Sequence, residues 1–337
     1  LARARGHQVT LYFNEAPAEG TFAEATRRVI PFPRLWTHLR LGWALRRDPP
    51  DVFFTPAHVI PISYFGPSVA TVHDLGYRVF PAAHTAFQLA YLNWSTLHNA
   101  RRSRRVLADS KTTRDDLVRF YHISPAKIDV VYPGVDPSLA PVRDPDVLAA
   151  VQARYTIRGP YMLYLGTIQP RKNLVRLVEA YAASGITESL VLAGKAGWLS
   201  KPILDAMAEL PLDVQARIRI TGFVDEADKA ALFAGATALL YPSLYEGFGF
   251  PVLEAQACAT PVLCANSSSL PEVAGEGALL VDAADAGAIR EGIQQLSTDA
   301  DLRQRLVAAG LENARRFSWQ KTAGQALASL EQAASER

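Results

Sequence analysis

Cysteine is scarce in this chain of 337 residues, which contains only Cys258 and Cys264. Two cysteines cannot build a disulfide scaffold, and no further ligands stand near them to complete a metal site. We therefore expect two reduced thiols in a cytoplasmic protein, and no metal site.

Long apolar runs are also lacking. The uncharged stretch 52–72 comes nearest, but Pro56, Pro61 and Pro67 interrupt it, so it predicts two short strands rather than a membrane span. No secretory signal is recognisable. With 49% hydrophobic and 20% charged residues, the chain is expected to form two globular domains.

Net charge is small, at +2, but it is uneven along the chain. Residues 1–140 hold 17 Lys and Arg against 11 Asp and Glu, and the remainder holds 18 against 22. A basic first half suits an anionic partner, such as a membrane surface, or simply solvated helix faces. With a pI near 8.5 and no repeated basic–aromatic motif, nucleic-acid binding is not expected.

Short β-rich runs alternate with helical patterns along the whole chain, which predicts parallel sheets wound with helices in an α/β fold. Expected helices include 146–155, 174–183, 226–234 and 286–296. Several expected strands are almost wholly apolar, as strands buried on both faces must be. The expected strands are 8–13, 52–55, 68–72, 105–109, 128–131, 161–165, 189–193, 218–221, 238–241, 261–265 and 278–281.

Prolines cluster between residues 133 and 160 and indicate a connection between two doubly wound, Rossmann-like domains facing a cleft. We expect an N-terminal domain over 1–141, a C-terminal domain over 142–318, and a last helix over 319–337 that packs back toward the first domain. Residues 1–7 predict the end of a helix with a Gly stop, so the strand before it is expected to be missing.

The run 245–254 places two carboxylates, Glu246 and Glu254, on either side of Gly247 and Gly249. The glycines allow backbone N–H groups to approach an anion, and Pro251 favours a helix start whose positive end faces that anion. Glu254 would fall in the first helical turn, where it can reach ligand hydroxyls. The alternative is an ordinary turn followed by an ordinary helix start.

The run 166–173 begins where an expected strand ends, and Gly166 permits close backbone approach. Arg171 and Lys172 then stand at an expected helix start, where cations are unfavourable unless they bind an anion such as a phosphate. A solvated helix start is the alternative. Neither the dinucleotide glycine pattern nor a P-loop is present. This weakens the case for an oxidoreductase and for an ATPase.

A third candidate is His73, which follows the expected strand 68–72. A side chain at the carboxyl end of a parallel strand is expected to point into the ligand cleft. Asp74 could orient His73 or hold a loop.

Together these runs resemble retaining glycosyltransferases of family four, which have the GT-B fold. The amino-acid sequence of residues 170–173 is most similar to the mannosyltransferase-B-like branch. The resemblance covers about 70–320 in family order. It is carried by residues 73–75, 108–110 with 113–117, 132–136, 166–173, 221–224, 245–254 and 269–273.

The resemblance implies a role for each matching residue. Arg171 and Lys172 would bind the donor diphosphate, Glu254 the ribose hydroxyls, and His73 the donor sugar. The remaining donor-binding positions would be Glu246 and the backbone of Gly166, Phe223, Val224, Gly247, Phe248 and Gly249. Fixed cations would stabilise the leaving diphosphate without a metal or another cofactor, and Glu246 is not assigned as a nucleophile.

The implied reaction moves a hexose, with GDP-mannose as the guessed donor, onto a saccharide or lipid-linked acceptor in surface polysaccharide synthesis. The alternatives are a non-catalytic nucleotide-sugar-binding or scaffold protein, or an epimerase or hydrolase on the same fold. The basic run 101–105 and the segment with Trp36, Trp43 and Arg40 suit peripheral contact with the inner face of an anionic membrane. Core aromatics with surface arginines would look the same.

Overall fold

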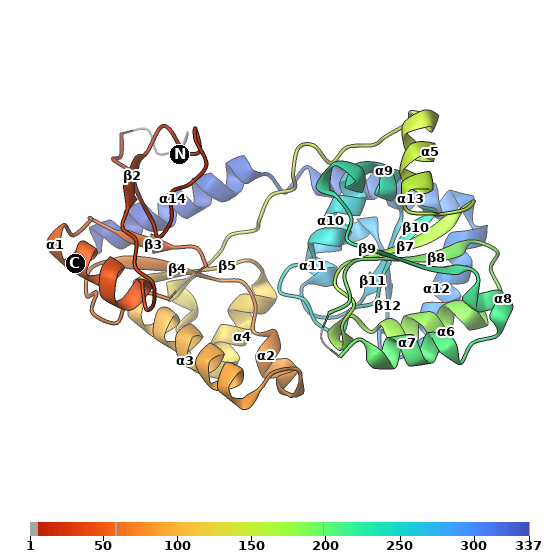
Figure 1. The fold of residues 1–337 in the computed structure, drawn as a ribbon, viewed down its shortest axis with the longest axis horizontal. Helices are drawn as coiled ribbons and strands as arrows, with labels where there is room; N and C mark the ends of the chain where they lie inside the picture. The colour runs from red at the N-terminus through yellow and green to blue at the C-terminus, as the bar shows by residue number, and fades with distance from the viewer. Residues whose placement is uncertain (1–5, 58, 198, 337) are drawn as a thin grey trace. The chain divides into compact units, whose positions relative to one another are not determined.

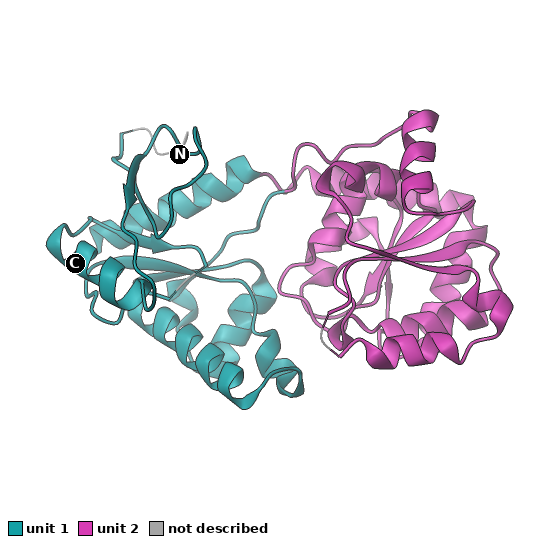
Figure 2. Ribbon diagram, viewed as in Figure 1, with its two compact units in different colours: residues 1–134, 319–337 teal, residues 135–318 magenta. Residues whose placement is uncertain are grey.

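The chain divides into two compact units in the computed structural model, which describes residues 6–57, 59–197 and 199–336. Unit 1 comprises residues 1–134 and 319–337, and unit 2 comprises residues 135–318 (Figure 2). The helix end that we expect over 1–7 falls mostly on residues 1–5, which lie outside the described residues.

The boundary between the units falls after Gly134 rather than after residue 141. Leu139 is buried in the core of unit 2, Val135 packs against that core, and the Val135 N–H donates to the Phe317 carbonyl. The proline-rich connection therefore joins unit 2 earlier than expected, because prolines mark a linker but not the point where its apolar residues become buried.

Unit 2 is built on a six-stranded sheet of order β12-β11-β10-β7-β8-β9, in which every neighbouring pair is parallel. The strands are β7 (Tyr161–Leu165), β8 (Ser189–Ala193), β9 (Ile218–Gly222), β10 (Ala238–Tyr241), β11 (Val262–Ala265) and β12 (Leu279–Val281). β7, β10 and β11 are buried along their whole length, because helices cover both faces of the sheet (Figure 1).

The helices of unit 2 follow its strands in the alternation that the sequence predicts. They are α5 (Pro145–Arg154), α6 (Leu174–Ser184), α7 (Lys201–Ala208), α8 (Leu212–Gln215), α9 (Lys229–Ala234), α10 (Phe250–Ala257), α11 (Leu270–Ala274), α12 (Ala286–Thr298) and α13 (Ala300–Ala314). Short turns η4 (Pro170–Lys172), η5 (Glu226–Asp228) and η6 (Gly275–Gly277) separate some of them.

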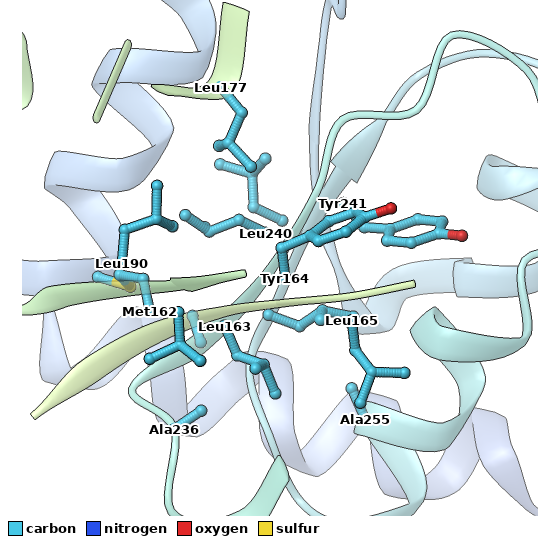
Figure 3. Close-up of a cluster of buried hydrophobic side chains, with 14 of the residues drawn as sticks. Met162, Leu163, Tyr164, Leu165, Leu177, Leu190, Ala236, Leu240, Tyr241 and Ala255 are labelled. Carbon is cyan, nitrogen blue, oxygen red and sulfur yellow. The ribbon is translucent and has the colours of Figure 1, made fainter. Parts of the chain in front are cut away.

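The core of unit 2 is mainly apolar, and two of its buried tyrosines lie near the ends of β7 and β10. Met162, Leu163 and Leu240 fill the sheet interior, whereas Tyr164 and Tyr241 lie side by side with their hydroxyls pointing the same way (Figure 3). The two rings are stacked, with centroids 5.9 Å apart. Since a buried tyrosine hydroxyl needs a partner, this pair marks where the core gives way to a polar site.

Unit 1 contains a four-stranded parallel sheet of order β3-β4-β5-β6 and a separate parallel pair, β1 with β2. The strands are β1 (Thr10–Phe13), β2 (Thr26–Val29), β3 (Phe53–Thr55), β4 (Ser68–Val72), β5 (Arg105–Ala108) and β6 (Ile128–Val130). The helical segments are η1 (Thr37–Leu41), α1 (Gly42–Arg47), α2 (Gly76–Val79), η2 (Pro81–Ala83), α3 (Ala86–Arg102), α4 (Lys111–Tyr121), η3 (Pro125–Lys127) and α14 (Trp319–Ser335).

The last helix, α14, belongs to unit 1 and covers its sheet. Ala333 is fully buried against Val69 and Leu107, and Leu330 packs beside it. Hydrogen bonds add to this contact: Arg104 donates to the Ala333 carbonyl at 2.8 Å, and Ser329 Oγ donates to Asp129 Oδ2 at 2.8 Å.

These sheets confirm the predicted α/β class of parallel, helix-covered sheets. β2 was not predicted, because its four residues, Thr-Arg-Arg-Val, are all exposed and carry no apolar alternation. Within the described residues, no helix combines the length and the apolar character that crossing a membrane requires.

Ala333→Asp tests the docking of α14. The change would bury an unpaired carboxylate against Val69 and Leu107, so we expect the free energy of unfolding of unit 1 to fall by several kcal/mol, about 3 or more. Ala334→Asp, an exposed neighbour on the same helix, is the matched control and should change it by less than about 0.5 kcal/mol. Urea denaturation followed by circular dichroism measures both, and equal midpoints would contradict the contact.

Candidate functional site

Two glycine loops meet where β7 and β8 end. Gly166, at φ 152°, donates its N–H to the Ala193 carbonyl at 2.9 Å, and Gly194 lies so close that a β-carbon there would stand 1.9 Å from the Gly166 oxygen. No side chain fits at position 194, so glycine is required for the two backbones to approach. The loops therefore place backbone at the carboxyl edge of the sheet, where parallel α/β folds bind ligands.

Arg171 and Lys172 lie in the single turn η4, not at the start of a longer helix as we expected. Asn173 separates that turn from α6, because it adopts a left-handed conformation with φ 61°. Its side-chain amide donates to the carbonyls of Pro242 at 3.1 Å and Ala283 at 2.7 Å. Asn173 thus fixes the cation-bearing turn to the ends of β10 and β12.

A buried ionic cluster joins this turn to the two-glutamate run. Lys172 Nζ lies 2.5 Å from Glu246 Oε1 and donates to the Tyr241 hydroxyl at 2.7 Å, and that hydroxyl donates to Glu246 Oε1 at 3.1 Å. Arg171 donates to Glu246 Oε2 at 2.9 Å and to the Tyr245 carbonyl. The side chains of Glu246 and Lys172 are 8% and 9% exposed, so they are charged groups held almost out of water.

The cations determine the ionisation of Glu246. Burial on its own raises the pKa of this carboxyl, but the charges of Lys172 and Arg171 outweigh burial, and the pKa of Glu246 is lowered. Burial also raises the pKa of the Tyr241 hydroxyl well above its usual value, so Tyr241 stays protonated and can donate. The cluster is therefore an ionised carboxylate that faces two cations and one hydroxyl.

Two serines shape the backbone that follows Glu246. The Glu246 N–H donates to Ser268 Oγ at 2.9 Å, and Ser269 Oγ contacts the carbonyls of Glu246 at 2.9 Å and Phe248 at 2.7 Å. Gly249 takes φ 107° beside Leu270, where a β-carbon would stand 2.6 Å from a leucine methyl group. The glycine run is thus locked into one conformation at the N-terminus of α10.

The side chain of Phe248 belongs to the core of unit 2. Phe248 is 4% exposed, and its ring packs edge-to-face against Phe250 and Phe317. A role of Phe248 in ligand binding would therefore rest on its backbone, as would that of Gly247.

Glu254 lies in the second turn of α10 rather than the first, because the helix begins at Phe250, one residue before Pro251. Its Oε1 is 3.7 Å from Lys229 Nζ, which also contacts Glu226 at 2.9 Å. Burial raises the pKa of Glu254, and Lys229 only partly opposes that effect. A neutral ligand rich in hydroxyls would suit such a carboxylate, because its hydroxyls need hydrogen-bond acceptors and the ligand brings no further charge.

Phe223 and Val224 differ sharply in exposure although they are neighbours after β9. Val224 is buried, whereas the Phe223 ring is 57% exposed and lies 4.7 Å from Lys195 Nζ in the loop after β8. An exposed aromatic ring beside a cation at the carboxyl edge of the sheet offers a flat surface for a ligand ring.

In unit 1, His73 stands at the end of β4 as expected, but its partner is Asp109, at the end of β5. His73 Nδ1 lies 2.7 Å from Asp109 Oδ2, and Nε2 lies 2.9 Å from the Pro56 carbonyl. Both neighbours can accept, so this arrangement favours the imidazolium form, which donates from both ring nitrogens. The hydrogen bond to Asp109 accordingly raises the pKa of His73.

Asp74 holds the loop rather than the histidine. Its Oδ1 accepts a hydrogen bond of 2.7 Å from the Gly76 N–H at the start of α2. The Thr113 hydroxyl donates to the His73 carbonyl at 3.1 Å, and Ser110 caps α4 by accepting from the Thr113 N–H. Sequence motifs 73–75 and 108–113 therefore build one local structure.

The structure brings Arg171, Lys172 and Glu246 into contact and places Gly166, Gly249, Glu254 and Phe223 in the same unit, whereas His73 belongs to unit 1. Sequence reasoning missed Tyr241, Asn173, Lys229 and the orienting role of Asp109. An asparagine directly before an apolar helix was the available signal for Asn173, because asparagine tolerates the left-handed region.

Two family profiles match the chain. Residues 155–313 match the profile described as glycosyl transferases group 1, and residues 1–139 match that of Glycosyltransferase Family 4. O-antigen chain mannosyltransferase B of Escherichia coli is 31% identical over 298 residues, which are 87% of this chain and 77% of that protein. A D-inositol 3-phosphate glycosyltransferase of Salinispora tropica is 32% identical over 65% of this chain, which spans only 48% of that protein.

Solved structures show the same fold at low identity. A glycosyltransferase from Rickettsia africae has a TM-score of 0.77 and 17% identity, covering 98% of this chain and 92% of that one. Anabaena HepE in complex with UDP-glucose has a TM-score of 0.75 and 16% identity, covering 96% and 91%. These similarities confirm the predicted GT-B fold.

Asp109→Asn tests the orientation of His73. Without the carboxylate, the pKa of His73 is expected to fall toward its ordinary value of about 6.5. A raised pKa in the folded state stabilises the protein below the unfolded value and loses that contribution as pH rises through the folded value, so the variant should also lose this pH dependence of stability. NMR titration of the ring protons, assigned with His73→Gln, measures the shift.

Asp74→Asn is the control for that titration, because Asp74 contributes least to the raised pKa of His73. It should leave the titration nearly unchanged. An unaltered midpoint in Asp109→Asn would refute the ion pair.

Proposed function

The chain belongs to the group 1 glycosyltransferases of family four, and we propose that it transfers a hexose from a nucleoside-diphosphate sugar to a saccharide or lipid-linked saccharide acceptor. Mannose is the proposed sugar and GDP-mannose the proposed donor, because the relative that is 31% identical over 87% of this chain is a mannosyltransferase. The product would enter a surface polysaccharide or another glycoconjugate, made on the cytoplasmic side of the membrane.

The buried Arg171–Lys172–Glu246 cluster is the observation that carries this proposal. As the bond between sugar and diphosphate breaks, negative charge grows on the leaving diphosphate, and cations fixed in a low-dielectric site stabilise it most. Arg171 and Lys172 are fixed by Glu246, Tyr241 and the Asn173 anchor before any donor binds. They would supply the positive charge without a metal.

Glu246 would organise these cations in addition to contacting the donor sugar. Both of its oxygens already accept hydrogen bonds, and its pKa is lowered, which makes it a weak nucleophile. This favours transfer without a covalent glycosyl–enzyme intermediate. From the resemblance to retaining enzymes of family four, we propose that the acceptor oxygen attacks the face from which the diphosphate departs, so that the configuration at the sugar carbon is retained.

The remaining contacts follow the chemistry of each side chain. Glu254 would accept hydrogen bonds from the ribose hydroxyls, the base would lie by Phe223 and Val224, and the backbone of Gly166 and of 247–249 would approach the phosphates. His73, whose pKa is raised, would donate a hydrogen bond from Nε2 to a hydroxyl of the donor sugar in place of the Pro56 carbonyl.

A donor screen tests the proposal as a whole. Thermal melting with GDP-mannose, UDP-glucose and the free diphosphates identifies the nucleotide, because a ligand that binds the folded state raises the melting temperature. Transfer from the stabilising donor to a mannose-containing acceptor, with the anomeric configuration read by NMR, tests the reaction. Binding without turnover would indicate a non-catalytic protein, and donor cleavage without transfer would indicate a hydrolase.

Lys172→Met should abolish transfer and also lower stability by about 3–5 kcal/mol, because Glu246 loses a buried partner. The double variant Lys172→Met with Glu246→Gln should regain most of that stability yet stay inactive, which separates catalysis from folding. Lys201 on α7 is 83% exposed, and Lys201→Met should change neither the transfer activity nor the stability. Wild-type turnover in the folded double variant would overturn the role of Lys172.

Glu254→Gln should raise the donor KM roughly tenfold without lowering the melting temperature. Burying this charged carboxylate opposes folding, as its raised pKa shows, so its neutral isostere costs nothing. In the unmodified protein, the donor KM should rise as pH falls through that raised pKa, and the variant should lose this dependence.

Glu226→Gln is the control for Glu254, because it touches the same lysine but is 79% exposed. It should leave the donor KM unchanged. A flat KM profile in the unmodified protein would exclude Glu254 from donor binding.

A further inference from the structure

Turn η5 and Lys229, the residue that follows it, are anchored by one tyrosine of unit 2. Tyr155 comes directly after α5 and is 8% exposed, and its hydroxyl donates to Asp228 Oδ2 at 2.7 Å. The same hydroxyl accepts a hydrogen bond of 3.1 Å from the Asp225 N–H. One phenol therefore binds the residue before η5 through its backbone and the last residue of η5 through its side chain. We call residues 225–229 the anchored turn.

Asp228 is the centre of this anchor. It is 5% exposed, and Arg154 donates from one guanidinium nitrogen to both of its carboxylate oxygens at 2.7 Å. A carboxylate held so far from water needs such donors. The Asp228 N–H also donates to the Asp225 carbonyl at 3.0 Å, which closes the turn, and Arg219 of β9 donates to the Tyr155 carbonyl at 3.3 Å. Helix α5, the anchored turn and β9 are thus joined (Figure 1).

The anchored turn is connected to each residue that is proposed to contact the nucleoside of the donor. Phe223 and Val224 directly precede it, and they form the proposed base wall. Lys229 ends it, and the Lys229 ammonium lies 2.9 Å from Glu226 and 3.7 Å from Glu254, the proposed ribose ligand. If the turn moved, the backbone of the base wall and the cation beside Glu254 would move with it.

The cations proposed for the diphosphate have a separate support. Lys172 is held by Tyr241 and Glu246, and Asn173 ties its turn to the ends of β10 and β12. None of these contacts involves the tyrosine and the aspartate of the anchored turn. The nucleoside half and the diphosphate half of a donor would therefore be held by two different networks, whose effects on affinity can be measured separately.

We propose that Tyr155 and Asp228 are positioning residues for the nucleoside half of the donor. They act through the anchored turn and need not touch the ligand. Because the turn is fixed in advance, little conformational freedom would be lost when the base and the ribose bind. This inference rests on the proposed function, since it takes the nucleoside contacts from there.

Tyr155→Phe tests the proposal, because it removes only the hydroxyl that both ends of the anchored turn share. Isothermal titration calorimetry with GMP should show a loss of about tenfold in affinity, whereas the affinity for inorganic pyrophosphate should change by less than about twofold. If the donor screen identifies a uridine donor, UMP replaces GMP. In turnover assays the donor KM should rise by a similar factor of about ten, with kcat nearly unchanged.

Tyr181→Phe is the matched control. Tyr181 on α6 is also buried in unit 2, and its hydroxyl donates to the Glu188 carbonyl at 2.7 Å. Both variants lose one buried hydroxyl, so both should lower the melting temperature, but Tyr181→Phe should leave the affinities for GMP and pyrophosphate unchanged. Asp228→Asn weakens the anchor from its other side and should reproduce the selective loss of GMP affinity.

Three results would overturn the proposal. The first is a folded Tyr155→Phe variant that binds GMP as tightly as the unmodified protein. The second is an equal loss of GMP and pyrophosphate affinity in that variant, and the third is the same loss of GMP affinity in Tyr181→Phe, because both would indicate a general loosening of unit 2. An unmodified protein that binds no nucleotide would instead reject the proposed donor, and this inference with it.

Discussion

The candidate site depends on one buried ion pair, between Lys172 and Glu246. Neither charge could be held so far from water without the other, since an isolated charge costs far more to bury than folding can supply. The pair is completed by Arg171 and by the Tyr241 hydroxyl, so the carboxylate is satisfied at both oxygens. The glycine loops, the serines after β11 and the Asn173 anchor all serve to keep this arrangement in place.

This pairing also explains how the cations are held in position before a ligand binds. Two cations that faced each other with no carboxylate between them would repel, and water would screen them. With Glu246 present they are oriented and neutralised in advance, so an incoming diphosphate meets donors that need little rearrangement. The cluster is therefore preorganised by the same interaction that makes it stable.

The sequence predicted much of the fold because the buried strands carry their own signal. β7, β8 and β10 lie at the expected residues, since wholly apolar runs of four or five residues between turns have few alternatives. β2 has no such signal. The helix expected over 174–183 does begin at Leu174, but the left-handed conformation of Asn173 before it was not predicted. Among the site residues, Arg171, Lys172 and Glu246 could be named, but their mutual contact could not. Asp109 and Tyr241 pair with residues 36 and 69 positions away, and only the tertiary fold makes those partners.

The return of α14 to unit 1 has a consequence for the order in which the chain becomes structured. Arg104 and Asp129 find their partners 229 and 200 residues further along, after the whole of unit 2 has been synthesised. During translation Val69 and Leu107 lack the cover of Ala333 until α14 has been made, whereas unit 2 is one continuous segment, 135–318. The half of the protein that leaves the ribosome first is thus the half that is finished last, and its apolar sheet depends on the final turns of the chain for its cover.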